Sequence, residues 1–257
     1  MDLINEISII AAINNPSVAE QNLLRSPLLR VEEVQFIPAE GFTTAPLAYN
    51  YARMRAGGQL LVFVHQDVYL PLGWEYLLLD TVTELDKKGT LWGVLGVVGV
   101  GVFGGVRGRV WSTGLAREVG APVNRPEGAV SLDELLLVIR KNSGLTFDER
   151  LPGWHLYGTD IVQEALRRDL GAYIIHAPVI HNSLPVARFD HGFTDCYNYL
   201  RQKWSSQLPV QTCCIKVTRT GWPLMKRQIR QMLRTTDRQT SDRLPDPAAK
   251  ARALGYE

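Results

Sequence analysis

The sequence predicts an α/β domain with a mostly parallel central sheet and helices on both of its faces. Apolar strands and amphipathic helices alternate along the first hundred residues, an order typical of parallel sheets with helical crossovers. The 257 residues and the hydrophobic fraction of 46% suffice for one large core. We therefore expect a single domain over residues 1–206 and a C-terminal extension over 207–257.

Four strands and three helices make up the alternating pattern. The apolar run at 7–13 predicts the first strand, and the following helix opens with Ser17, a capping residue that has Glu20 three positions later. The other expected elements are a strand at 31–37, a helix at 46–57, a strand at 59–64, a helix at 73–89 and a strand at 91–97.

Composition narrows the possible partners and compartment. The formal net charge of +2 is too small to indicate nucleic acid as a partner. The three cysteines, two of them adjacent, have no metal-ligand spacing and form no disulfide framework. The N-terminal segment carries acidic residues where a signal peptide has positive charge. We expect a cytoplasmic protein.

The uncharged stretch at 91–106 invites two other interpretations. It is too short and too rich in glycine for a transmembrane helix of about 20 residues. Its "GVGVFG" at 99–104 matches a dinucleotide-binding fingerprint, but that motif needs a helix after it, and the residues that follow lack helical periodicity. A buried strand followed by a glycine loop is the favoured interpretation, and a nicotinamide-dependent enzyme is disfavoured.

Polar residues appear where the buried strand at 60–64 ends. His65, Gln66 and Asp67 follow it directly, and ligands of such sheets bind beyond the carboxyl ends of the strands. Carboxylate oxygens suit magnesium or manganese, and imidazole suits manganese better than magnesium. Alternatively, Asp67 only caps the turn before Pro71. The spacing alone leaves both alternatives open.

Five segments in order resemble the family-2-like glycosyltransferases of GT-A fold. They are "ISIIAAINN", "APLAYNYARMRAGGQLLVFVHQDVYLP", "SLDELLLVIRK", "LTFDERLPGWHLYGTDI" and "APVIHNS". The resemblance covers about residues 7–205 and is greatest to the branch whose strand end reads His-Gln-Asp-Val. It implies an inverting enzyme that moves a sugar from a nucleotide-sugar donor to a glycan or other hydroxyl acceptor, with Mn²⁺ or Mg²⁺ as cofactor.

The resemblance also assigns donor and metal residues. His65 and Asp67 stand where such enzymes usually have Asp-x-Asp, so Asp67 is expected to bind the metal together with His181. His65 replaces the first aspartate, which removes a negative charge from this position. The residues expected at the donor are Asn14, Thr44, Asn50, His65, Asp67 and Asp133. Turn and helix-surface polarity would equally explain Asn14 and Asn50.

Acceptor chemistry is expected in the second half of the chain. Asp160, near the start of a predicted helix, matches the carboxylate that takes the acceptor proton, although an aspartate there also suits an N-cap. Trp154, His155 and Tyr157 precede it and are expected to bind the acceptor, since aromatic faces stack on sugar rings, although they would also suit core anchors.

The extension contains a basic amphipathic helix at about 222–235. Apolar Leu224, Ile229, Met232 and Leu233 alternate there with basic Lys226, Arg227, Arg230 and Arg234. This pattern permits peripheral contact with an anionic membrane, at its inner face, or packing against the domain. The final residues, 244–257, are expected to be loosely ordered.

A domain that binds nucleotide sugar without catalysis remains the alternative to an enzyme. The histidine in place of the first aspartate favours it, as does the second-strand loop, in which Glu40 is the only acid.

Overall fold

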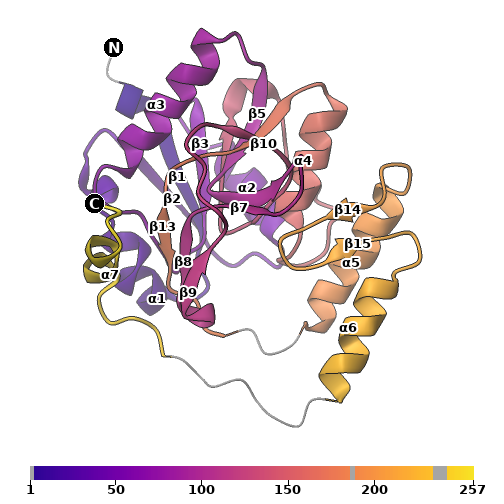
Figure 1. Ribbon diagram of the computed structural model, residues 1–257. Helices are drawn as coiled ribbons and strands as arrows, with labels where there is room; N and C mark the ends of the chain where they lie inside the picture. The colour runs from indigo at the N-terminus through magenta and orange to yellow at the C-terminus, as the bar shows by residue number, and fades with distance from the viewer. Residues whose placement is uncertain (1–2, 186–188, 234–241) are drawn as a thin grey trace.

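A nine-stranded sheet forms the centre of the computed structural model, which describes residues 3–185, 189–233 and 242–257 (Figure 1). In spatial order its strands are β2 (Gln35–Ala39), β1 (Ile7–Ala12), β3 (Leu60–Val64), β11 (Leu136–Arg140), β5 (Trp92–Gly96), β12 (Gly171–Ile174), β10 (Glu127–Leu132), β6 (Val98–Gly101) and β7 (Val106–Gly108). Strands β2, β1, β3, β5, β12 and β6 run in one direction, which confirms the expected mostly parallel α/β fold.

Strand β11 runs against its two neighbours, β3 and β5. In its register with β3, Leu136 lies opposite Val64 and Arg140 lies opposite Leu60. The beginning of β11 therefore lies beside the end of β3. This reversal brings the residues before Leu136 to the edge where His65 follows β3.

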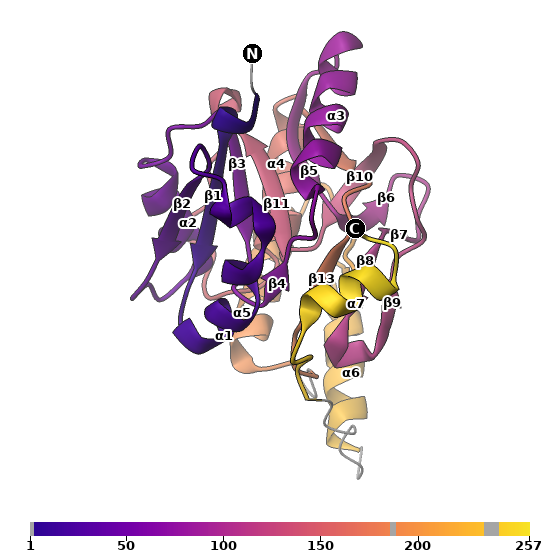
Figure 2. The ribbon, with the colours of Figure 1, turned by 90° about the vertical axis from the view of Figure 1, so that its left-hand side faces the viewer.

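Helices cover both faces of the sheet, as expected. One core layer contains α2 (Ala45–Arg53), α4 (Tyr157–Arg167) and α5 (His191–Lys203). The other contains α1 (Pro16–Gln21) and α3 (Trp74–Lys87). In Figure 2, α1 lies in front of the sheet and α4 and α5 lie behind it. The strands between them are apolar on both sides, as the fully buried sequence LLVFV of β3 illustrates.

Smaller elements complete the described chain. A four-stranded sheet contains β4 (Val68–Tyr69), β13 (Val179–His181), β8 (Val110–Ser112) and β9 (Arg117–Val119). A hairpin of β14 (Val210–Gln211) and β15 (Lys216–Val217) precedes α6 (Trp222–Met232), and α7 (Pro247–Ala253) lies near the C-terminus. Short 3-10 turns span Leu3–Glu6, Leu23–Arg25, Pro27–Arg30, Thr113–Leu115 and Lys141–Ser143.

The first helix differs from the sequence-based prediction. It begins at Pro16, because Asn15 caps it by accepting a hydrogen bond from the Val18 amide at 3.3 Å, so Ser17 is not the cap. The helix ends at Gln21, and two 3-10 turns replace the rest of the predicted helix. The buried Asn22 side chain donates back to the Val18 carbonyl at 2.8 Å, a side chain to backbone bond of the kind that competes with helix.

The glycine-rich motif forms an antiparallel hairpin. Strands β6 and β7 pair directly, and Gly104 and Gly105 turn between them with φ of +86° and +79°. Strand β8 follows β7, and the next α-helix, α4, begins only at Tyr157, which excludes the arrangement that a dinucleotide-binding motif needs. The described residues of the protein also include no helix that is long and apolar enough to cross a membrane.

The expectation of a loosely ordered C-terminal end at residues 244–257 is wrong. Asp246 caps α7 by accepting from the Ala249 amide at 3.1 Å, and Ala251 is fully buried. The Tyr256 hydroxyl donates to Glu118 at 2.7 Å. This segment packs on the smaller sheet because its apolar side chains form a separate small core there.

Replacing Tyr256 by alanine tests this packing. Tyr256 is 5% exposed, so Tyr256→Ala should lower the free energy of unfolding by about 2–4 kcal/mol through lost apolar contacts. The exposed Ala253 on the same segment is the control, since Ala253→Ser should change the free energy of unfolding by less than about 0.5 kcal/mol. Equal denaturant midpoints for Tyr256→Ala and wild type would mean that the segment adds no stability.

Candidate metal and substrate site

The ends of β1 and β3 are tied together by Gln66. Its side-chain oxygen accepts hydrogen bonds from the backbone amides of Asn14, at 3.1 Å, and Asn15, at 3.0 Å. The backbone amide of His65 donates to the Leu135 carbonyl at 3.0 Å, which joins the same edge to the start of β11. Gln66 therefore holds the loop in shape, and the residues on either side of it face the site.

Strand pairing brings His181 beside Asp67. Strands β4 and β13 are antiparallel, with His181 opposite Val68, and the Asn182 amide donates to the Asp67 carbonyl at 2.8 Å. As a result His181 Nε2 lies 3.4 Å from Asp67 Oδ1. His65, Asp67 and His181 each offer one ligand atom, and these three atoms lie within 4.8 Å of one another. We call them the metal triad.

The charges within the triad are complementary. Burial alone would raise the pKa of Asp67, but His181, His65 and Arg243 outweigh it and hold the pKa of this carboxyl well below its usual range. Burial lowers the pKa of His65 to about 4, so its ring is neutral at pH 7. Burial also opposes the charged form of His181, but the Asp67 carboxylate is stronger and raises the pKa of His181.

Tyr157 decides which nitrogen of His65 is free. The Tyr157 hydroxyl donates to the Glu134 carbonyl at 3.0 Å, because a carbonyl can only accept. His65 Nε2, at 2.8 Å from the same hydroxyl, must then be the donor, which leaves Nδ1 unprotonated. The expected role of Tyr157 in acceptor binding does not fit, since its side chain is 1% exposed. It orients His65 instead.

The triad fits a divalent cation. Two imidazole nitrogens and a carboxylate oxygen suit Mn²⁺ better than Mg²⁺, which prefers oxygen ligands. A spread of 4.8 Å is close to the separation of about 4 Å between opposite ligands of one ion. Tyr157 supplies the second hydrogen bond that ligating histidines commonly make.

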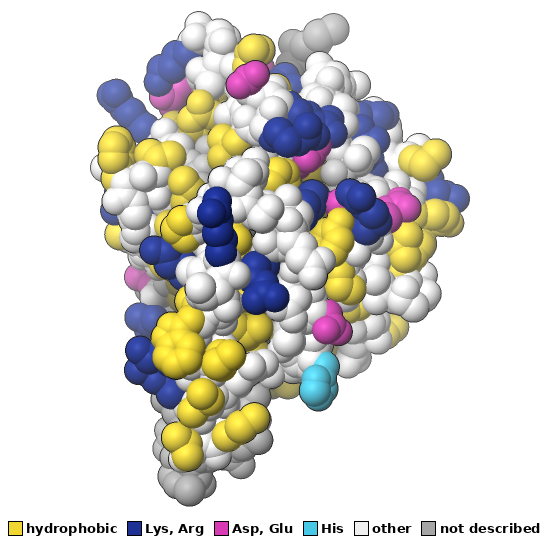
Figure 3. Space-filling view, turned by 90° about the vertical axis from the view of Figure 1, so that its right-hand side faces the viewer, with side chains coloured by type: hydrophobic (Ala, Val, Ile, Leu, Met, Phe, Trp, Pro, Cys, Tyr) yellow, Lys and Arg dark blue, Asp and Glu magenta, His cyan; other side chains and the backbone are white. Residues whose placement is uncertain are grey.

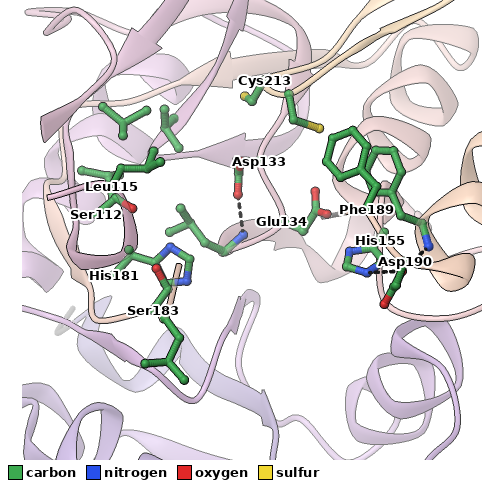
Figure 4. A pocket seen from close by; sticks show the side chains of 18 of the residues that line it. Ser112, Leu115, Asp133, Glu134, His155, His181, Ser183, Phe189, Asp190 and Cys213 are labelled. Carbon is green, nitrogen blue, oxygen red and sulfur yellow. Dashed lines mark hydrogen bonds and ion pairs between the residues drawn. The ribbon is translucent and has the colours of Figure 1, made fainter. Parts of the chain in front are cut away.

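Two cavities meet at the triad. The small cavity, of about 260 Å³, is lined by residues that include Asn14, His65, Asp67 and Trp154. The large cavity, of about 500 Å³, includes His181, Asp133, Ser112 and Phe189 (Figure 4). Glu134 and His155 line both cavities and so mark their boundary. Asn14, Trp154, His155 and Asp133 therefore lie where a substrate could touch them.

Glu134 is a site residue that the sequence analysis missed. It precedes β11, and its Oε1 accepts a hydrogen bond from the Leu156 amide at 3.0 Å. Burial, reinforced by the neighbouring Asp133, raises the pKa of Glu134 to about 8. The acidic pair Asp133 and Glu134 was visible in the sequence, but only the reversed direction of β11 shows that the pair faces the end of β3.

Asp160 occupies a different place from the one expected. Its carboxylate is 3% exposed, and it accepts hydrogen bonds from Lys203 Nζ at 2.8 Å and Trp204 Nε1 at 2.7 Å. It lines neither the small nor the large cavity. The base role expected for Asp160 is therefore inconsistent with its position, because both oxygens join α4 to the end of α5.

Two expected donor residues also have structural partners. The Asn50 side chain donates to the Phe147 carbonyl at 2.8 Å and accepts from the Phe147 amide at 3.0 Å. Thr44 caps α2 by accepting from the Leu47 amide at 3.4 Å. Neither lines the small or the large cavity, so the expected contacts of Asn50 and Thr44 with the donor do not fit these positions.

A residue from the C-terminal segment reaches the triad. Arg243 Nη2 lies 3.7 Å from Asp67 Oδ2, and Arg243 Nε donates to the Asn182 carbonyl at 3.0 Å. The Asn182 side chain in turn bonds both backbone groups of Leu244, at 2.7 Å and 2.9 Å. Arg243 thus adds positive charge beside Asp67 from a segment far away in the sequence.

No protein-family model and no curated protein match the chain. Among solved structures, it is similar to GalNAc-T7 with UDP, GalNAc and Mn²⁺, at 13% identity and a TM-score of 0.48 over 79% of this chain and 51% of that one. It is similar to the mannosyltransferase PcManGT from Pyrobaculum calidifontis with GDP-Man and Mn²⁺, at 12% identity and 0.48 over 89% and 70%. It is also similar to S. aureus TarS 1–349, at 15% identity and 0.46 over 80% and 66%.

The chain thus spans about half of the GalNAc-T7 chain and just under two thirds of TarS 1–349.

Removing one triad ligand tests the metal site. Wild-type protein should bind Mn²⁺ in calorimetry, and Asp67→Asn should weaken binding at least about tenfold because the only carboxylate ligand is lost. Asp190→Asn is the matched control, since Asp190 lines the large cavity outside the triad and asparagine preserves its capping of α5. Unchanged Mn²⁺ affinity in Asp67→Asn would contradict the assignment.

Proposed function

We propose that the protein is an inverting glycosyltransferase of GT-A fold that moves a sugar from a nucleotide-sugar donor to a hydroxyl acceptor. The observation that carries this proposal is the position of the half-buried Glu134 carboxylate between two cavities that meet at a metal triad. Donor diphosphate, cation, acceptor hydroxyl and base are the four parts that such a reaction needs. The order of the five sequence segments supports the same function.

The small cavity is the proposed donor site. Asn14 and Trp154 line it beside two triad residues, His65 and Asp67, so a diphosphate bound there would lie against the cation site. Bound Mn²⁺ would supply the positive charge that stabilises the departing diphosphate. Arg243, 3.7 Å from Asp67, adds a positive charge of this chain's own near the same position.

The large cavity is the proposed acceptor site. Ser112 lies on one side of it, and the other side includes His155 and the stacked rings of Phe189 and Phe193, whose centroids are 3.8 Å apart (Figure 4). Aromatic faces and polar groups in one cavity suit a sugar or another amphipathic alcohol. His155, at the boundary, would contact both substrates.

Glu134 is the proposed general base. The acceptor oxygen attacks the anomeric carbon and forms the new glycosidic bond while the bond from that carbon to the diphosphate breaks. The acceptor proton passes to the Glu134 carboxylate, and the diphosphate leaves with the electron pair of the broken bond. A base on the acceptor side, opposite the leaving group, is what inversion requires. Burial raises the pKa of Glu134 and so makes its carboxylate a stronger base than an exposed one.

A non-catalytic domain that binds nucleotide sugar is the alternative. It would bind donor and metal through the same triad but would need no base beside the acceptor cavity. The proposal of an enzyme is favoured because half-buried acids with a raised pKa, such as Glu134, cluster at functional sites.

Comparing two carboxamide variants separates the candidate bases. Glu134→Gln should keep donor affinity and Mn²⁺ binding while transfer falls about 10²–10⁴-fold, since glutamine cannot accept the proton. Asp160→Asn should retain transfer within about tenfold, but its free energy of unfolding should fall by about 1–3 kcal/mol, because the charged bond to Lys203 is weakened. Steady-state assays measure the transfer activity of both variants, and denaturant unfolding measures their free energy of unfolding.

The reverse pattern would overturn the assignment of Glu134. If Asp160→Asn abolished transfer at normal stability and Glu134→Gln were active, Asp160 would be the base. A further outcome is that wild-type protein binds UDP or GDP with Mn²⁺ but neither transfers nor hydrolyses any nucleotide sugar of a broad panel. The alternative, a non-catalytic domain that binds nucleotide sugar, would then be correct.

The pH dependence of transfer should reflect Glu134. Because the base acts when deprotonated, kcat/KM should rise with pH and level off above the pKa of Glu134. Burial raises that pKa to about 8, and a bound cation nearby lowers it, so the midpoint should lie between about 4.5 and 8. This rise of kcat/KM with pH should be absent from the residual activity of Glu134→Gln. If the rise persisted in Glu134→Gln, it would reflect the titration of another group.

A further inference from the structure

One side of α6 presents large apolar side chains to solvent. The other side packs inward through Leu224, which is 5% exposed, and through Gln228, which donates to Thr194 of α5 at 3.1 Å. The outward apolar side chains are between 45% and 82% exposed and are Trp222, Met225, Ile229, Met232 and Leu233. We call these five residues the α6 stripe.

The stripe is continuous along the helix. Its members follow one another at spacings of three, four, three and one residues, which places them on one face of an α-helix. Figure 3 shows hydrophobic side chains gathered at the lower left of that face of the molecule, with Lys and Arg side chains beside them. Exposed apolar surface of this extent on one element marks an interaction site.

The charge around the stripe selects the partner. Residues 222–233 contain Lys226, Arg227 and Arg230 and no Asp or Glu. At 100° per residue, Lys226 and Arg230 border the stripe on one side. An apolar face with a tryptophan and a basic border is typical of helices that lie in the interface of an anionic bilayer. A second copy of the chain would bring two wholly basic helices together, which is unfavourable.

We propose that α6 lies on the surface of an anionic lipid bilayer with its stripe inserted among the lipids. The opposite flank of the same helix belongs to the large cavity, since Arg227 and Gln231 line it and Arg227 packs over the Phe189 ring at 4.5 Å. Docking through α6 would therefore hold the rim of the large cavity at the membrane. Of the helix expected at 222–235, Arg234 and residue 235 lie outside the described residues.

Vesicle flotation tests the proposal with the full chain. Wild-type protein should float with phosphatidylcholine vesicles that contain phosphatidylglycerol and much less with pure phosphatidylcholine, and added salt should release it. The variant Met225→Gln/Ile229→Gln/Leu233→Gln should lower partitioning at least about tenfold, because three inserted side chains become polar. Lys226→Gln/Arg230→Gln should lower it about fivefold for each residue.

Exposed apolar residues elsewhere supply the control. Met54, Leu72 and Leu91 are 83%, 63% and 74% exposed, so Met54→Gln/Leu72→Gln/Leu91→Gln removes as many apolar side chains without touching α6. This variant should float like wild type. All variants change exposed residues, and equal melting temperatures verify their folding.

Three results would overturn the proposal. They are absence of flotation by wild-type protein, flotation that the stripe variant retains, and a dimer in analytical ultracentrifugation that the stripe variant converts to monomers. Flotation requires no sugar transfer, and Glu134→Gln should float like wild type. The membrane proposal and the proposed enzyme activity can therefore fail independently.

Discussion

The ion pair between Asp67 and His181 is the interaction on which the rest of the site depends. A buried carboxylate is stable only with compensating charge, and here His181 supplies it from 3.4 Å while Arg243 adds more from the opposite oxygen. Each of these residues comes from a different part of the chain. The ends of β3 and β13 and the C-terminal segment therefore have to meet for Asp67 to be stable as an anion.

A cation that binds the triad would displace the proton of His181, because a metal-ligating imidazole is neutral. His65 is neutral because it is buried, and the Tyr157 hydroxyl determines that its Nδ1 is the unprotonated nitrogen. A triad with one negative charge and two imidazoles carries less charge than two aspartates would. Arg243 lies 3.7 Å from Asp67, so the positive charge that the proposed donor diphosphate needs can be divided between a cation and this arginine.

Position in space distinguishes two acids, of which the sequence analysis chose only Asp160 as the base. Asp160 and Glu134 are both close to the start of α4, but Asp160 joins α4 to α5 through Lys203 and Trp204, whereas Glu134 lies at the boundary of two cavities. The difference arises because Glu134 precedes β11 at the edge where His65 follows β3, whereas Asp160 lies in α4 beside the end of α5. A site defined by resemblance alone would have chosen the acid with the structural role.

The sequence by itself determined the layers of the fold and the edge that carries the site. Apolar runs and helical periodicity are local signals, so the strands at 7–12 and 60–64, helices α2, α3 and α4 and the polar triplet after β3 were predictable. His181 was also predicted as the partner of Asp67, and the structure brings the two together. Only the tertiary structure decided the direction of β11, the packing of residues 242–257 and the contact of Arg243 with Asp67, because strand direction and long-range packing depend on contacts between distant segments. Glu134 became a site residue for that reason: its surroundings are set by the reversed pairing of β11 with β3, which no local pattern encodes.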